Sequence, residues 1–85
     1  MKKPIIKSIS RKILYKTLID FIHKEKLTED HVILLNTKNF DDVVLDFREF
    51  YGESMTFDHR LLGVEIAEDY TNTVRLNKLG IIKDT

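Results

Sequence analysis

The chain has 85 residues, and its 42% hydrophobic and 33% charged content is typical of one folded domain with a modest core rather than of a disordered segment. It contains no cysteine, which excludes disulfides, thiolate metal sites and thiol nucleophiles. No apolar run approaches the ~20 residues that a membrane span needs, so we expect no membrane contact.

The formal net charge is zero, but the charges are segregated along the chain. Residues 1–26 hold eight Lys and Arg against two acidic residues, whereas residues 27–85 hold six against twelve. One interpretation is that the two parts attract each other within the fold or between subunits. The other is that the basic part contacts an anionic partner.

The chain begins with a basic arm, residues 1–7, followed by a single domain, residues 8–85. Because it contains Pro4, we expect the arm to be extended, with an edge strand as one form of it. Ser8 or Ser10 is expected to cap a helix that runs to about Lys26. Its apolar stripe consists of Leu14, Leu18, Phe21 and Ile22.

The central part of the chain predicts a strand, a helix and a second strand. Residues 31–35 and 61–66 are short apolar runs rich in branched side chains, which favour strands. Residues 39–52 have helical periodicity, with Asn39 as the expected cap and Asp41 and Asp42 in the first turn. Gly52 is expected to end the helix, and Gly63 to mark a bulge or a close backbone approach.

The last part of the chain predicts a turn at residues 68–73 and a third strand at residues 73–77, which alternate with a period of two. Residues 79–82 continue this strand or form a fourth. Because the last strands follow each other closely, we expect an antiparallel hairpin there, whereas the two strands around the central helix are parallel if they are neighbours.

The predicted fold class is therefore α+β, with two helices packed on one face of a small mixed three- to four-stranded sheet in the order α-β-α-β-β. The predicted core consists of Leu14, Leu18, Phe21, Ile22, Ile33, Leu35, Val43, Phe47, Phe50, Val64, Ile66, Val74 and Leu76.

The sequence lacks the motifs of common catalytic and metal sites. No serine lies in a Gly-x-Ser-x-Gly motif, the three glycines form no phosphate loop, and the histidines lack metal-ligand spacing. Asp58 beside His59 is the nearest approach to an acid–base pair. We therefore expect no catalytic residues, no metal, no cofactor and no small-molecule substrate.

The most regular charged feature is a ridge along the central helix, formed by Asp42, Asp46, Glu49 and Glu53. These carboxylates lie opposite the apolar side, and like charges at such spacing cost a few tenths of a kcal/mol per pair. The ridge is either a solvated outer face or a docking surface for a basic protein, including another copy of this chain. Carboxylates along one helix do not enclose Ca²⁺ without ligands from elsewhere.

The alternative binding function is contact with nucleic acid through the basic arm and first helix. The residues that would neutralise phosphates are Lys2, Lys3, Lys7, Arg11, Lys12 and Lys16. The acidic remainder would repel the same polymer, and no helix-turn-helix spacing is present. The leading hypothesis is therefore a non-enzymatic protein-binding or assembly module that self-associates or binds a protein partner.

Residues 32–66 carry a resemblance to a known family. The run Val32-Ile-Leu-Leu-Asn-Thr-Lys-Asn-Phe40, the helix ending at Tyr51-Gly52, and Leu61-Leu-Gly-Val-Glu-Ile66 resemble a segment of phage major capsid proteins. In that family a strand ending in Asn, a helix and a Leu-Leu-Gly-Val strand form part of one domain. The resemblance implies a small phage or mobile-element protein, and it names no active site. The expected location is cytoplasmic, from the lack of a membrane span, or virion-associated if the protein is of phage origin. The basic helical N-terminus departs from the long arm of that family.

Overall fold

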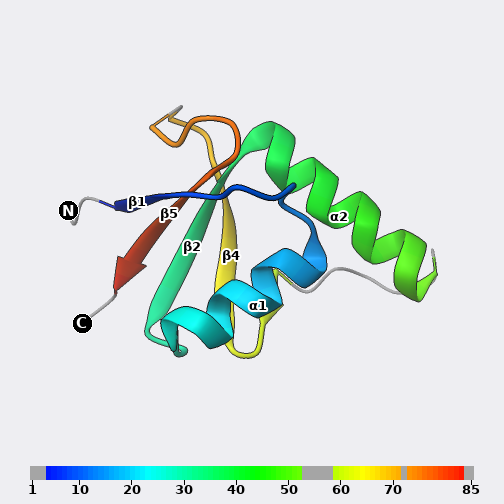
Figure 1. Cartoon of the computed structure of the whole chain (residues 1–85), viewed down its shortest axis with the longest axis horizontal. Coiled ribbons are helices and arrows are strands. Elements are labelled where there is room, and N and C mark those ends of the chain that lie inside the picture. Colours follow the sequence, from blue (N-terminus) through cyan, green and yellow to red (C-terminus); the bar gives the residue numbers. More distant parts are fainter. Residues whose placement is uncertain (1–3, 53–58, 72, 84–85) are drawn as a thin grey trace.

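The computed structural model describes residues 4–52, 59–71 and 73–83. Its elements are β1 (Ile5–Ser8), α1 (Tyr15–Glu25), β2 (His31–Asn36), α2 (Thr37–Tyr51), β3 (Arg60–Leu61), β4 (Val64–Asp69) and β5 (Lys78–Lys83). The α+β class is confirmed, and both helices lie on the same side of the sheet (Figure 1). Neither helix within the described ranges is long and apolar enough to cross a membrane.

The sheet has five strands in the order β1-β5-β2-β4-β3. The prediction that the strands around the central helix are parallel is confirmed, because β2 and β4 pair in parallel through the α2 crossover. The predicted hairpin at the end of the chain is wrong, since β5 pairs antiparallel with β1 and β2 and not with β4. The predicted strand count is too low because β1 and β3 also join the sheet.

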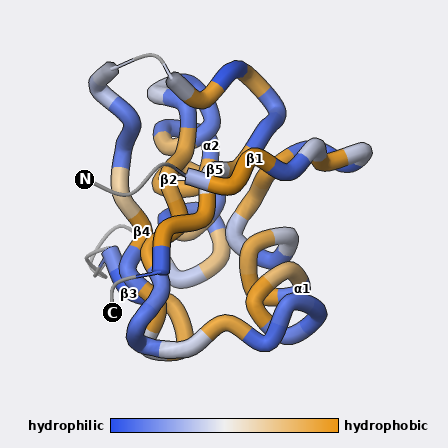
Figure 2. Tube along the Cα trace, turned by 90° about the vertical axis from the view of Figure 1, so that its left-hand side faces the viewer, coloured by the Kyte–Doolittle hydropathy of each residue, from blue (hydrophilic) through white to orange (hydrophobic). Residues whose placement is uncertain are grey.

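The core lies between the helices and the sheet face that carries Ile33, Leu35, Val64 and Ile66. β5 and β2, which lie in the interior of the sheet, are the strands drawn mostly as hydrophobic in Figure 2. Most of the predicted core is buried, and the buried set also includes Ile13, Phe40, Leu61, Leu79 and Ile81, which were not in the prediction.

Two predicted core residues are exposed, and Leu14 is only partly buried. Phe50 is 77% exposed because the last turn of α2 projects past the sheet (Figure 1), so its ring lies against Tyr51 rather than in the core. Leu76 is exposed because residues 73–77 form turns rather than the predicted third strand.

Helix α1 begins at Tyr15, not at Ser8 or Ser10 as predicted, because Ile5–Ser8 pair with β5 and extend the backbone. The residue before the helix, Leu14, has no side chain that can cap it. A carboxylate oxygen of Asp46 on α2 accepts the Tyr15 backbone N–H at 3.1 Å instead. The first helix is therefore capped by a residue of the second.

Helix α2 begins two residues before the predicted cap. The Asn36 side chain accepts the Lys38 backbone N–H at 3.0 Å, so Asn36 and not Asn39 is the cap. Asn39 is buried and accepts the Asn77 backbone N–H at 2.7 Å. Because of this earlier start, no acidic residue lies in the first turn, which corrects the prediction for Asp41 and Asp42. Gly52 ends the helix with a φ of 91°.

The predicted strand at residues 61–66 is a hairpin in the structure. Leu61 and Val64 face each other across a two-residue turn, Leu62–Gly63, with φ values of 52° and 86°. Two positive φ angles in succession are typical of a type I′ turn, which suits the twist of a hairpin. Gly63 is therefore the second turn residue and not a bulge.

The segment after β4 is held by Asp69, which is buried. Its carboxylate accepts the Val74 backbone N–H at 2.6 Å, the Thr71 backbone N–H at 3.1 Å and the Thr71 hydroxyl at 2.7 Å. Burial raises the pKa of Asp69, but the hydrogen bonds from Thr71 and Val74 outweigh it and hold the pKa below its usual value. These bonds fold the segment back so that Val74 is buried against Gly80 of β5.

Candidate functional site

The outer edge of β4 is only partly covered by β3. β3 has two residues, which pair with Val64 and Glu65, and the Ile66 backbone N–H donates to the His59 carbonyl at 2.8 Å. Beyond Ile66 the described part of the chain places no strand on this side of β4. Because backbone groups alternate in direction along a strand, the N–H and C=O of Glu68 point to the same side as those of Ile66. Within residues 4–52, 59–71 and 73–83, the β4 edge is therefore open beyond the Ile66 N–H as far as Asp69, and such an edge is a template for pairing with another chain.

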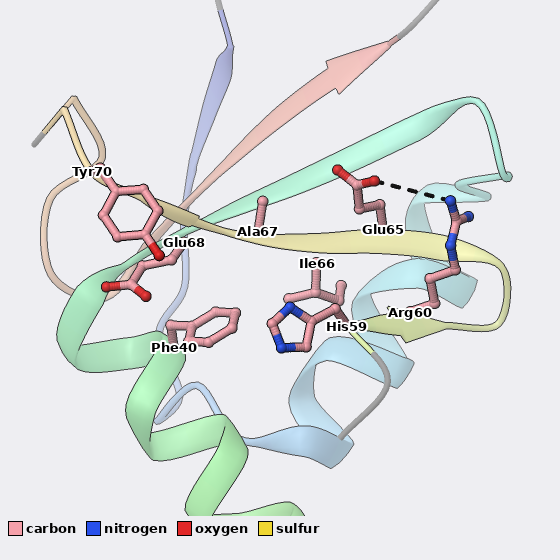
Figure 3. Close-up of a pocket in the computed structure, with 8 residues that line it drawn as sticks. All are labelled: Phe40, His59, Arg60, Glu65, Ile66, Ala67, Glu68 and Tyr70. Carbon is pink, nitrogen blue, oxygen red and sulfur yellow. Dashed lines mark ion pairs between the residues drawn. The ribbon is translucent and has the colours of Figure 1, made fainter. Parts of the chain in front are cut away.

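A pocket of about 330 Å³ lies along this edge. Residues from α2, from the start of the β3–β4 hairpin and from β4 line it, and they are Phe40, His59, Arg60, Glu65, Ile66, Ala67, Glu68 and Tyr70 (Figure 3). Phe40 and His59 stand edge to face with ring centroids 5.3 Å apart and form the helix-side wall. Tyr70 is 82% exposed and lies at one end, next to Glu68.

The charges of the pocket differ between its two ends. At one end Arg60 and Glu65 form an exposed ion pair at 4.0 Å (Figure 3). At the other end Glu68 forms no ion pair with any cation of the described residues. The Glu68 carboxylate is therefore available to a basic side chain on an incoming segment, while Ile66 and Phe40, which are almost fully buried, form the apolar lining between the two ends.

The pocket residues do not form a recognisable catalytic or metal constellation. Within residues 4–52, 59–71 and 73–83 no group of three or more His, Asp or Glu side chains is placed to hold a metal ion. Asp58, the predicted acid–base neighbour of His59, lies outside the described residues.

Sequence reasoning did not single out this pocket. Phe40 was not among the predicted core residues, and Glu68 was predicted as part of a turn. The position of a pocket beside a strand edge depends on which strands pair. β3 has only two residues, and its end determines how much of the β4 edge it covers. The sequence signal that could have located it is Leu62–Gly63 as a hairpin turn, because this turn fixes where β3 ends.

Three of the four residues of the predicted acidic ridge lie close together in the structure. Asp42, Asp46 and Glu49 line a notch of about 270 Å³ together with Lys12. Asp42 pairs with the Lys38 ammonium at 2.6 Å, and Asp46 caps α1. These contacts offset the repulsion between the like charges inside the fold. Glu49 is exposed, and Glu53 lies outside the described residues.

The predicted nucleic-acid residues are spread over several elements. Lys7 pairs with Glu25 at 3.8 Å and Arg11 with Asp20 at 3.4 Å. Lys12 faces the acidic notch, and Lys16 is exposed on α1. Lys2 and Lys3 lie outside the described residues.

A second surface that sequence reasoning missed is an aromatic cluster at the end of α2. The rings of Tyr15, Phe47 and Tyr51 contact one another with centroid distances of 5.3, 5.6 and 4.7 Å, and Phe50 stands against Tyr51 at 4.8 Å. Burial raises the pKa of Tyr15 to about 12, together with its hydrogen bond to Tyr51. The Tyr15 hydroxyl therefore stays neutral and serves packing.

Comparison of the chain with protein-family models, with curated proteins and with solved structures found no match. The resemblance of residues 32–66 to a capsid segment stays a prediction.

Proposed function

We propose that this chain is a non-catalytic protein-binding module that takes up an extended protein segment along the outer edge of β4. The observation that supports this proposal best is the open edge at residues 66–69 beside a pocket of about 330 Å³. Strand addition is a common mode of peptide recognition, in which backbone hydrogen bonds supply affinity and the adjacent pockets supply specificity.

The pocket suggests the chemistry of the segment. A side chain on the helix side of the extended sheet meets Phe40 and Ile66, where an apolar group gains about 1.5–3 kcal/mol if fully buried. A residue two positions along on the same side meets Glu68, which favours Lys or Arg. A side chain between them points to the opposite face and meets Ala67, which leaves room for an apolar group. The preferred segment is therefore short, extended, apolar and basic.

Selection from a displayed library of random peptides tests the proposal. With the wild-type protein as bait, we expect enrichment of peptides that alternate apolar and basic residues. Glu68→Lys should abolish the enrichment, because it reverses the charge that faces the basic residue. Glu49→Lys is the matched control, since it makes the same change on an exposed ridge residue, and it should leave the enrichment intact.

Amide chemical shifts on binding of a selected peptide then locate the site. We expect the largest shifts at residues 66–70 and at Phe40. If the shifts fall on α2 near Glu49, and Glu49→Lys rather than Glu68→Lys prevents binding, the docking surface is the acidic ridge and the β4 edge is not the site.

A further inference from the structure

The sheet has a second open edge, on β1. β1 is the outermost strand opposite β3, and its two isoleucines are exposed to an unusual degree, Ile5 by 63% and Ile6 by 42%. Exposed apolar side chains on an edge strand favour association, because pairing with another strand removes them from water. One molecule therefore carries a β1 edge on one side of the sheet and a β4 edge on the other.

The two edges run in the same direction. β1 is antiparallel to β5, β5 is antiparallel to β2, and β2 is parallel to β4, so β1 is parallel to β4. A second copy placed beside the first in the same orientation presents its β1 parallel to the β4 edge. The sheet then continues from one copy to the next, with the helices of both copies on the same side.

The side chains of the two edges match face by face. Ile5 and Lys7 face the helix side, because their partners Ile81 and Leu79 belong to the core. On β4 the helix side carries Ile66 and Glu68, and the opposite side carries Ala67. Alignment of residues 5–8 with residues 66–69 places Ile5 beside Ile66, Ile6 beside Ala67, and Lys7 beside Glu68.

Charge favours this pairing over symmetric pairing centred on the charged residues. Two β1 edges paired about Lys7 would bring two Lys7 side chains together, and two β4 edges paired about Glu68 would bring two Glu68 carboxylates together. Like charges at paired positions are unfavourable, whereas Lys7 against Glu68 is favourable. The ion pair between Lys7 and Glu25 at 3.8 Å does not prevent this, because the Lys7 side chain is 47% exposed.

We propose that the extended segment taken up at the β4 edge is β1 of a second copy of this chain, so that copies assemble head to tail. This inference rests on the proposed function and names the partner of the same site. Each added copy leaves one β1 and one β4 edge open, so association continues until a ring closes or an open chain forms.

Charge reversal at each edge tests the inference by sedimentation velocity over a range of protein concentrations. For the wild type we expect the mean mass to rise with concentration and to fall at high salt. Lys7→Glu and Glu68→Lys should each raise the concentration of half-association about tenfold, because attraction becomes repulsion. An equimolar mixture of the two variants should associate again, because contacts between unlike variants join opposite charges. The Glu at position 7 of one variant meets the Lys at position 68 of the other, and Lys7 of the second meets Glu68 of the first.

Matched controls are Lys16→Glu on α1, beside the end of α2, and Glu49→Lys on α2, which change the same charges at exposed positions away from both edges. Lys7→Gln serves as a milder variant, since reversal at Lys7 also places like charges beside Glu25. Thermal melts establish that each variant is folded.

Three results would overturn the inference. A wild-type protein that stays monomeric up to the millimolar range would show that a second copy is not the partner of the β4 edge. The proposed function would still be tested separately by the peptide selection. Association lost in Lys7→Glu but unchanged in Glu68→Lys would indicate contact between β1 edges. A mixture of the two variants that fails to associate while each is folded would exclude the pairing of Lys7 with Glu68.

Discussion

At the residue scale, burial separates two phenylalanines that lie three positions apart on α2. Phe47 is buried and contacts the rings of Tyr15 and Tyr51, whereas Phe50 is exposed beyond the sheet. The helical pattern predicted both as core, because periodicity describes the faces of a helix but not where its partner ends. Their energetic roles should therefore differ sharply.

Phe47→Ala is expected to lower the free energy of unfolding by ~3–5 kcal/mol, which would largely unfold a chain of this size. Phe50→Ala should change it by less than ~0.5 kcal/mol, since the side chain is already in water. Thermal melts followed by circular dichroism measure both. Equal shifts in the two midpoints would contradict the burial described for α2.

Asp69 makes stability depend on pH. Since its pKa is lower in the folded state than in the unfolded chain, its contribution is fully present above the unfolded value, about 3.9, and is lost as the pH falls through the folded value. Asp69→Asn should cost about 1–3 kcal/mol at neutral pH, because the amide replaces one acceptor oxygen.

Urea unfolding of wild type and Asp69→Asn over a series of pH values measures this contribution. The difference in unfolding free energy should be constant down to about pH 5 and should shrink below it. If the difference in unfolding free energy between wild type and Asp69→Asn stayed constant down to the lowest pH at which the protein folds, the Asp69 charge would contribute nothing to stability.

At the element scale, sequence patterns within a short window predicted helices and strands well, but the sequence did not predict which elements contact one another. Residues 31–35 and 39–52 were recognised because a strand run and a helical period are visible within a short window. The start of α1 and the pairing of β5 were missed, because Tyr15 is capped by Asp46 from α2 and β5 is inserted between β1 and β2. For the same reason the acidic ridge was predictable from spacing, but the β4 edge was not.

The cap that α2 provides to α1 predicts unequal roles within the acidic ridge. Asp46→Ala should lower the free energy of unfolding by ~0.5–2 kcal/mol, because the Tyr15 N–H loses its acceptor. Glu49→Ala should be close to neutral, since Glu49 is exposed. Chemical denaturation of the two variants measures the difference. A neutral Asp46→Ala would mean that the cap does not stabilise α1.

At the scale of the whole molecule, several basic side chains of the N-terminal part are paired with or face carboxylates, which argues against a polyanion as partner. Lys7 and Arg11 are paired with carboxylates, and Lys12 faces the acidic notch. A surface that binds nucleic acid needs cations that are free to contact phosphates along one stretch. We therefore expect protein contacts to dominate.

Fluorescence anisotropy of a labelled DNA duplex tests this expectation at several salt concentrations. We expect no binding at physiological salt. If five lysines did contact phosphates, the affinity would fall with a log–log slope of about −4 to −5. Binding that persists at physiological salt would support the nucleic-acid alternative if it is lost when Gln replaces Lys2, Lys3, Lys7, Lys12 and Lys16.

The position of β5 sets the order in which the chain can fold. β5 is the last strand described, yet it lies between β1 and β2 and supplies both with their antiparallel partner. During synthesis β2, α2 and β4 can pair as soon as they leave the ribosome, whereas β1 emerges first and has no partner until residues 78–83 follow. Non-local pairing of this kind slows folding. The N-terminal strand therefore spends the synthesis of most of the chain as an unpaired basic segment, open to capture by a neighbouring molecule.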